Sequence, residues 1–181
     1  MMISKGLLVI AIIIPIILGI LFIASNIPDN QDASIDNRIN IQLVREEMQL
    51  VSFGVTENVG SERRDILFVD DDGSILFSPE LGQGEPERNK ISINDLKIIK
   101  SFITDSGILL IEEGEFLPNS LPEKFVRYTL TINIDNTSKR FQWVENKDEF
   151  EPSNAPPLLI RLKDMIYCMT GKAELYAIKC S

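Results

Sequence analysis

The strongest constraint on this chain is an uninterrupted apolar run near its start. Residues 6–24 read GLLVIAIIIPIILGILFIA and contain no charged side chain. As an α-helix, a run of this length would span about 28 Å, close to the thickness of the hydrocarbon core of a bilayer. The sequence therefore predicts an N-terminal membrane anchor over residues 1–25, which crosses the membrane as a single helix through residues 6–24.

A cleaved secretory signal is the alternative interpretation of the same run. Signals usually have an apolar region of about 7–15 residues that ends at a small-x-small site. Here the run is longer, and Phe22 precedes Ile23 and Ala24 where a small residue is needed. These features favour an uncleaved anchor, although cleavage stays open.

The flanks of the run predict its orientation. Lys5 precedes it, whereas Asp29 and Asp32 follow it. By the positive-inside rule the N-terminus lies in the cytoplasm and the C-terminal part outside the cell. We therefore expect a single-pass protein of the cell membrane, and a cleaved signal would export the C-terminal part in the same direction.

The charge of the remaining chain limits its partners. Residues 25–181 carry 17 basic and 27 acidic side chains, a net charge of −10. Such a surface repels phosphate backbones and anionic lipids, so we expect no nucleic-acid partner. A basic protein would suit this charge, and solubility alone explains it equally well.

Periodicity divides the rest of the chain into a polar linker over residues 26–37 and a domain over residues 38–181. Alternating apolar residues predict a strand at 39–43, a weaker one at 51–55, and hairpins over 65–78 and 126–143. Ser92 with Asp95 predicts the start of one helix, and Pro157 suits the first turn of another. This order predicts an α+β domain in which a mostly antiparallel sheet packs two helices on one face.

Two cysteines lie close together near the C-terminus. Cys168 and Cys180 are twelve residues apart, and an oxidising compartment outside the cell would allow a bridge that stabilises the fold by about 3 kcal/mol. The alternative is a pair of buried thiols that never meet. We favour the disulfide because of the predicted topology.

Two turns carry weaker signals. Asn136 begins the tripeptide Asn-Thr-Ser, which is an N-glycosylation acceptor, although a plain turn chosen for Asn and Ser explains it equally well. The acidic run at residues 70–72 precedes Gly73, but Phe68 and Pro79 occupy the positions where a calcium loop needs ligands. An ordinary acidic turn is therefore expected there.

The chain contains no histidine, so the usual Ser-His-Asp, Cys-His and zinc-histidine sites are excluded. A Ser-Lys dyad or paired carboxylates would still allow hydrolysis, but no pattern brings such groups together. We expect no enzyme activity, no catalytic or metal-ligating residues and no cofactor.

Four segments between Ile39 and Met169 occur in a recognisable order. They are the opening strand, the helix INDLKIIKSFI, the hairpin VRYTLTINI…KRFQWV and the helix entry PPLLIRL. In order and spacing the chain resembles the emfourin type of small protein inhibitors of thermolysin-like metalloproteases. The chain departs from that pattern in its membrane anchor, in a longer acidic loop at residues 79–90 and in its disulfide-capable tail, and no inhibitory residue is carried over.

Three functions are therefore weighed. The first is a membrane-tethered, extracytoplasmic binding module without catalytic activity, which contacts an envelope or secreted protein through its sheet edges or acidic loops. The second, implied by the resemblance, is inhibition of a thermolysin-like metalloprotease. The third is a hydrolase that works without histidine.

Overall fold

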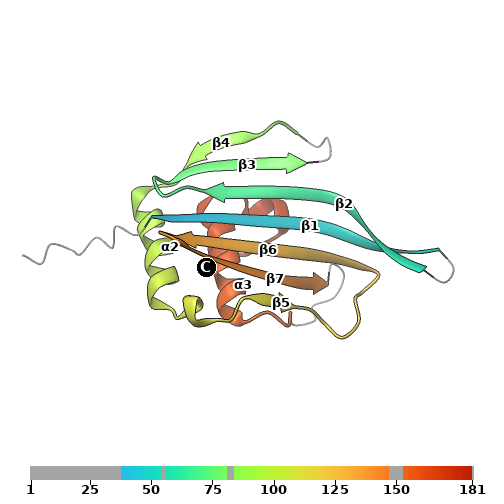
Figure 1. Cartoon of the computed structure of the whole chain (residues 1–181). Coiled ribbons are helices and arrows are strands. Elements are labelled where there is room, and N and C mark those ends of the chain that lie inside the picture. Colours follow the sequence, from blue (N-terminus) through green and yellow to red (C-terminus); the bar gives the residue numbers. More distant parts are fainter. Residues whose placement is uncertain (1–37, 54–55, 81–83, 147–152, 181) are drawn as a thin grey trace, which may run out of the picture. The chain divides into compact units, whose positions relative to one another are not determined.

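The computed structural model describes residues 38–53, 56–80, 84–146 and 153–180. They belong to one compact unit that spans Asn37–Ser181. Its elements, in chain order, are β1 (Ile39–Phe53), β2 (Thr56–Val69), β3 (Ser74–Glu80), β4 (Glu87–Lys90), α2 (Ile93–Asp105), η1 (Ile108–Leu110), β5 (Gly114–Phe116), β6 (Lys124–Ile134), β7 (Thr137–Asn146), α3 (Pro157–Met169) and η2 (Ala173–Tyr176) (Figure 1).

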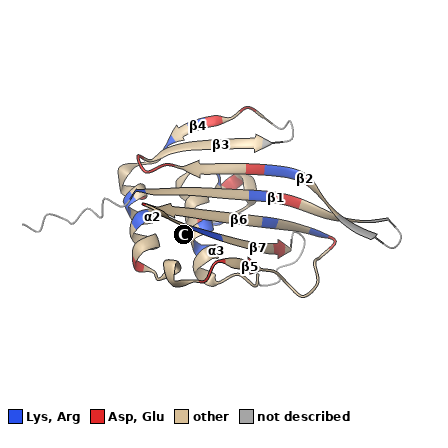
Figure 2. Ribbon diagram, in the orientation of Figure 1, with Lys and Arg blue, Asp and Glu red and all other residues tan. Residues whose placement is uncertain are grey.

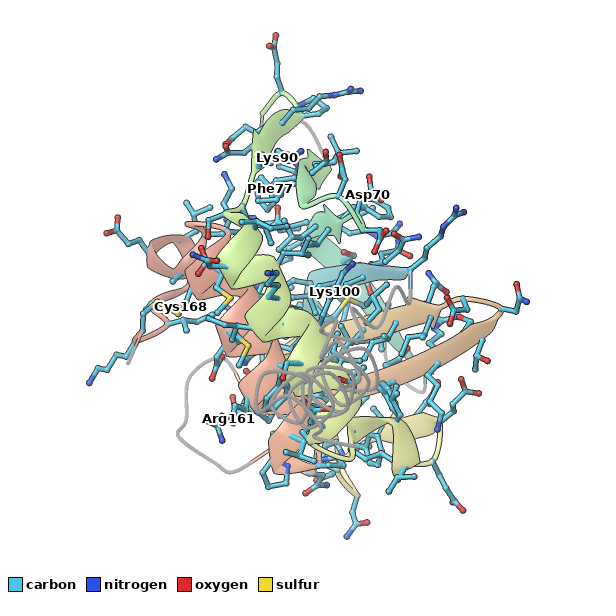
Figure 3. The ribbon with its side chains drawn as sticks, turned by 90° about the vertical axis from the view of Figure 1, so that its left-hand side faces the viewer. Asp70, Phe77, Lys90, Lys100, Arg161 and Cys168 are labelled. Atoms are coloured by element: carbon cyan, nitrogen blue, oxygen red, sulfur yellow. A yellow bond between two sulfur atoms is a disulfide. The ribbon has the colours of Figure 1, made fainter. Side chains whose placement is uncertain are left out.

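The strands form one seven-stranded sheet in the order β4-β3-β2-β1-β6-β7-β5. All neighbouring pairs are antiparallel except β5 and β7, which run parallel. Both α2 and α3 lie on one side of the sheet (Figure 3). Within the described part of the chain, no helix covers the other side.

The fold class expected from the sequence needs correction in two respects. The sheet is mixed, because β5 joins its edge in parallel; a strand of three residues is too short to reveal itself by alternation. Furthermore, no helix among the described residues is long and apolar enough to cross a membrane. The segment at 6–24, where a membrane-spanning helix was expected, lies outside the described residues.

The main core lies between the sheet and the two helices. Leu130, Phe141 and Trp143 from the sheet meet Ile99 of α2 and Leu162 of α3, and all five side chains are fully buried. The predicted start of α2 is confirmed, since the Ser92 hydroxyl accepts a hydrogen bond from the backbone N–H of Asp95 at 3.1 Å. The predicted hairpin of β6 and β7 is confirmed as well.

Two expectations at the level of single elements are wrong. The strands expected at 39–43 and 51–55 belong partly to one strand, β1, which continues through the charged residues between them. A terminal strand expected at 174–179 is instead the short 3₁₀ helix η2. The segment at 108–111, for which a strand was one of two expectations, is the 3₁₀ helix η1, with Ile108 packed into the core.

The acidic turn at residues 70–73 connects the start of the domain to α2. Asp71 accepts a hydrogen bond from the backbone N–H of Ile39 and forms an ion pair with Lys100 of α2. The hydrogen bond from Lys100 is the main reason why the pKa of Asp71 lies below its usual value. Gly73 has a φ of +83°, a left-handed conformation that glycine adopts without strain.

Candidate functional site

The most distinctive surface is a two-stranded extension of the sheet. β6 pairs with β1 only as far as Gln49, and β3 pairs with β2 only from Arg64 onward. Apart from the Leu50 N–H, which still donates a hydrogen bond to the Glu123 carbonyl oxygen at 2.8 Å, residues 50–53 of β1 and 56–63 of β2 therefore continue as a pair past the neighbouring strands (Figure 1). We call these residues the ribbon.

One edge of the ribbon has no neighbour in the part of the chain that the structure describes. Residues 56–63 pair with β1 on one side, and no described strand pairs with them on the other. The apolar side chains of Val51 and Val59 are 37% and 45% exposed. An unpaired strand edge with exposed apolar residues is a template for the addition of another strand.

The root of the ribbon is held on the outer face of the sheet by a small apolar cluster. Met48, Phe125 and Val144 are buried there, and Leu50 and Leu121 pack against them. A bulge between Glu47 and Met48 shifts the register of β1 against β2 at this point. Bulges increase the local twist, which helps the ribbon diverge from the rest of the sheet.

The face of β1 and β2 that carries the core changes from apolar to charged near the ribbon. Leu43 opposite Leu67 gives way to Arg45 opposite Asp65, and then to Glu47 opposite Arg63. Arg45 Nη1 lies 2.7 Å from Glu47 Oε1, and Arg63 Nε lies 2.8 Å from Asp65 Oδ2. Figure 2 shows these opposite charges side by side on the two strands. We call the four residues the charged cluster.

A tyrosine from the C-terminus covers the charged cluster. The Tyr176 hydroxyl donates a hydrogen bond to Asp65 Oδ2 at 2.8 Å, and the guanidinium carbon of Arg45 lies 4.5 Å from the centre of the Tyr176 ring. Burial, together with the hydrogen bond to Asp65, raises the pKa of Tyr176 far above its usual value. The neutral hydroxyl is therefore the form that this site stabilises.

A second ion pair, beside this cluster, joins α3 to β7. Lys163 Nζ lies 2.7 Å from Glu145 Oε1, which also accepts a hydrogen bond from the indole N–H of Trp143 at 3.0 Å. The same ammonium lies 4.7 Å from the centre of the Tyr128 ring. Because Lys163 is buried, these partners satisfy a charge that burial alone would destabilise.

The residues singled out in the sequence lie elsewhere. Cys168 and Cys180 form a disulfide, with their sulfurs 2.05 Å apart. Asn136 lies in the exposed turn between β6 and β7, where its modification remains a prediction. The acidic loop expected at residues 79–90 contains the edge strand β4 at residues 87–90. A second acidic segment, residues 147–152, lies outside the described part of the chain.

Sequence reasoning missed the ribbon and the charged cluster. Charged residues at 45–47 and 62–65 interrupt the apolar alternation, so the two strands were not recognised as one long pair. Their complementary signs, Arg45 opposite Asp65 and Glu47 opposite Arg63, were the available signal. The contribution of Tyr176 depends on a contact between residues 111 positions apart, which periodicity cannot show.

Comparison with family models and with curated sequences identifies no relative. No model of a known protein family matches the chain, and no curated protein is detectably similar to it in sequence. The resemblance to emfourin-type inhibitors therefore stays a prediction. Among the described side chains, no three His, Cys, Asp or Glu residues gather where they could hold a metal ion.

Proposed function

We propose that this protein is an extracytoplasmic protein-binding module without catalytic activity of its own, held at the membrane through residues 6–24. The observation that carries the proposal is the ribbon. Residues 56–63 form a strand edge that no described strand covers, residues 59–62 are exposed, and Val59 adds an apolar side chain beside this edge. The partner proposed is an envelope or secreted protein.

The mode of binding follows from the chemistry of a free edge. A partner segment in an extended conformation would pair its backbone with β2, and apolar side chains of the partner would pack on Val59 or Val51. The outer-face cluster of Met48, Phe125 and Val144 fixes one side of the ribbon root. A fixed root reduces the entropy that the ribbon would lose on binding.

The proposed location rests on the sequence. The apolar run at 6–24 has the length of a membrane crossing, and the charges around it favour export of the C-terminal part. The disulfide between Cys168 and Cys180 is consistent with an oxidising compartment. Display of the domain outside the membrane would leave the ribbon accessible to other envelope proteins.

Inhibition of a thermolysin-like metalloprotease is a second candidate for the same edge. Proteases bind their substrates as extended segments, so an exposed strand edge suits a protease cleft as well as a strand of another partner. The resemblance to emfourin-type inhibitors favours this candidate. In that case the partner would be a metalloprotease, and binding would reduce the activity of that protease.

Site-specific photo-crosslinking in native membranes tests the proposal. A benzophenone amino acid replaces Val59 in one variant and Ile98 in a matched control, since the two side chains are 45% and 49% exposed. We expect one defined protein to be captured from position 59 and not from position 98. Capture of a metalloprotease would support inhibition. Equal capture from both positions, or none from position 59, would contradict binding at the ribbon.

A further inference from the structure

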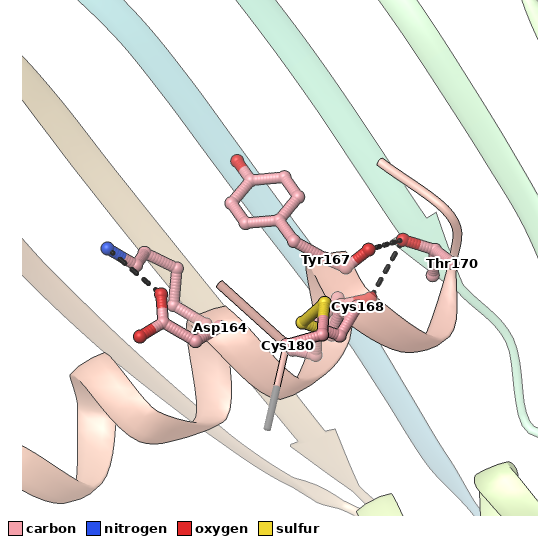
Figure 4. Close-up of a disulfide and its surroundings, with 7 residues drawn as sticks. Asp164, Tyr167, Cys168, Thr170 and Cys180 are labelled. Carbon is pink, nitrogen blue, oxygen red and sulfur yellow. Dashed lines mark hydrogen bonds and ion pairs between the residues drawn. A yellow bond between two sulfur atoms is a disulfide. The ribbon is translucent and has the colours of Figure 1, made fainter. Parts of the chain in front are cut away.

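The C-terminal segment, residues 171–180, connects α3 to several strands of the sheet. The disulfide joins Cys180 to Cys168 near the end of α3 (Figure 4). Lys172 Nζ lies 2.6 Å from Glu87 Oε2 on β4 and 4.5 Å from the centre of the Phe77 ring on β3. Tyr176 then reaches Asp65 on β2 and Arg45 on β1. One short covalently closed segment therefore contacts four strands.

Tyr176 is the part of this segment that closes the base of the ribbon. The centre of its ring lies 4.5 Å from the guanidinium carbon of Arg45 and 4.8 Å from the centre of the Tyr167 ring. Asp65 beneath it is only 2% exposed. The tyrosine thus keeps water away from the charged cluster as well as bonding to it.

Some polar atoms of the charged cluster have no hydrogen-bond partner among the described residues while Tyr176 covers the cluster. Among the described residues, Arg45 Nε and Asp65 Oδ1 have no hydrogen-bond partner, although both residues are more than nine-tenths buried. A buried polar atom without a partner loses the hydration it would have in water. Withdrawal of Tyr176 would hydrate both atoms, so the closed arrangement depends on what holds Tyr176 in place.

We propose that the Cys168–Cys180 disulfide is a redox-sensitive lock that holds Tyr176 over the charged cluster and thereby fixes the base of the ribbon. A dithiol reductant would open the lock. It supplies two electrons and two protons, the S–S bond breaks into the thiols of Cys168 and Cys180, and the reductant becomes a disulfide. Cys180 is exposed, so a reductant can reach the bridge.

Opening the lock changes the ribbon through the segment between the two cysteines. Without the bridge, the C-terminal segment regains the conformational freedom that loop closure had removed. Tyr176 then leaves Asp65 more often, water enters the charged cluster, and the pairing of β1 with β2 loosens at residues 45–47 and 63–65. An effect of this loosening on partner binding depends on the function proposed above. The loosening itself is independent of that function.

Amide hydrogen exchange of the full-length protein in detergent tests the lock. Exchange is compared before and after reduction with a water-soluble phosphine, in the wild type and in the Cys168→Ser, Cys180→Ser double variant. We expect reduction to speed exchange at residues 45–47 and 63–65 on the order of 100-fold. Residues 130–132 and 139–141 of the β6–β7 hairpin serve as the internal reference for the stability of the whole fold, and their exchange should rise less than that at the ribbon base.

The double variant and Tyr176→Phe complete the design. The double variant should exchange like the reduced wild type and should not respond to the phosphine. Tyr176→Phe keeps the disulfide and the ring but loses the bond to Asp65, so exchange at residues 63–65 should rise about tenfold. Unchanged exchange at the ribbon base after reduction would overturn the proposal. A rise of the same size in the hairpin would also overturn it, because the disulfide would then act only on the stability of the whole fold and not on the ribbon base.

The exchange result is independent of whether the ribbon binds a partner. If reduction loosens residues 45–47 and 63–65 while position 59 captures nothing in native membranes, the lock stands and the binding function fails. If position 59 captures a partner equally well before and after reduction and the exchange is unchanged, the binding function stands and the lock fails.

Discussion

The two halves of this sheet are built from strand pairs with opposite chemistry. In the β6–β7 hairpin, the inward-facing pairs are Leu130 with Phe141 and Tyr128 with Trp143, and the last two rings stack with centroids 5.3 Å apart. At the corresponding face of β1 and β2 near the ribbon, the facing pairs are Arg45 with Asp65 and Glu47 with Arg63. Both pairs are antiparallel, but only the first is apolar.

This difference in chemistry determines which part of the sheet can open. Apolar contacts are non-directional and remain favourable wherever water is excluded. Buried ion pairs approximately balance their own desolvation, so their stability depends on exact partners and on continued burial. The hairpin therefore anchors the fold, whereas the ribbon base is stable only while Tyr176 covers it.

The largest expected effect lies at the apolar half. Phe141 is fully buried, so Phe141→Ala should lower the free energy of unfolding by about 4 kcal/mol, through lost burial and the cavity left behind. Urea denaturation followed by circular dichroism measures it. A loss below about 1 kcal/mol would show that the hairpin is not the anchor of the fold.

A smaller effect is expected in the charged cluster. Asp65→Ala leaves Arg45 and Arg63 without this carboxylate in a largely buried site, which should lower the free energy of unfolding by about 3 kcal/mol. Glu62→Ala, on an exposed side chain of the same strand, is the control and should change it by no more than about 0.5 kcal/mol. Equal effects of the two variants would remove the distinction between the cluster and an ordinary charged surface.

The three tyrosines make the free energy of unfolding depend on pH. The chain has three tyrosines, and burial raises the pKa of each of them, Tyr128, Tyr167 and Tyr176. The folded state thus favours the neutral hydroxyls. The contribution of these tyrosines to the free energy of unfolding is fully present below the unfolded pKa of about 10. It is lost as the pH rises above that value, by up to about 1.4 kcal/mol per tyrosine for each pH unit.

Absorbance at 295 nm, which reports tyrosinate, checks the raised pKa of the folded-state tyrosines during an alkaline titration. The folded protein should show little tyrosinate at a pH where the urea-unfolded chain is more than half ionised. A native midpoint near pH 10 for one tyrosine would mean that its hydroxyl is solvated, and for Tyr176 it would mean that the charged cluster is open.

The smallest effect on stability is expected on the ribbon itself. Val59→Ser should change the free energy of unfolding by less than about 0.5 kcal/mol, as should Ile98→Ser on α2, because both side chains are exposed. A loss above 1 kcal/mol for Val59→Ser would show that Val59 is packed within the fold and does not serve a partner.

Sequence patterns were sufficient for elements whose causes are local. The hydrogen bond at Ser92 and the alternation along β6 are encoded within a few residues, and both were predicted. The disulfide partners were also identifiable, because the chain has only two cysteines.

The remaining features depend on long-range contacts. β5 is defined by its pairing with β7, and β1 continues through Arg45 and Glu47, which Asp65 and Arg63 face on β2 and which β6 pairs on the other side. The candidate site was therefore not predictable from periodicity. The ribbon lacks neighbours because β3 ends at Glu80 and β6 begins only at Lys124, and its base is closed by a residue from the far end of the chain.

The most direct test of this account is native-state hydrogen exchange of the oxidised full-length protein in low concentrations of denaturant. It compares amides at residues 59–63 of the ribbon with those at residues 130–132 of β6. We predict that the ribbon exchanges through local opening, at least about 100-fold faster than β6 and with little dependence on denaturant. Equal rates that rise together with denaturant would contradict the account, because the two halves of the sheet would then open as one unit.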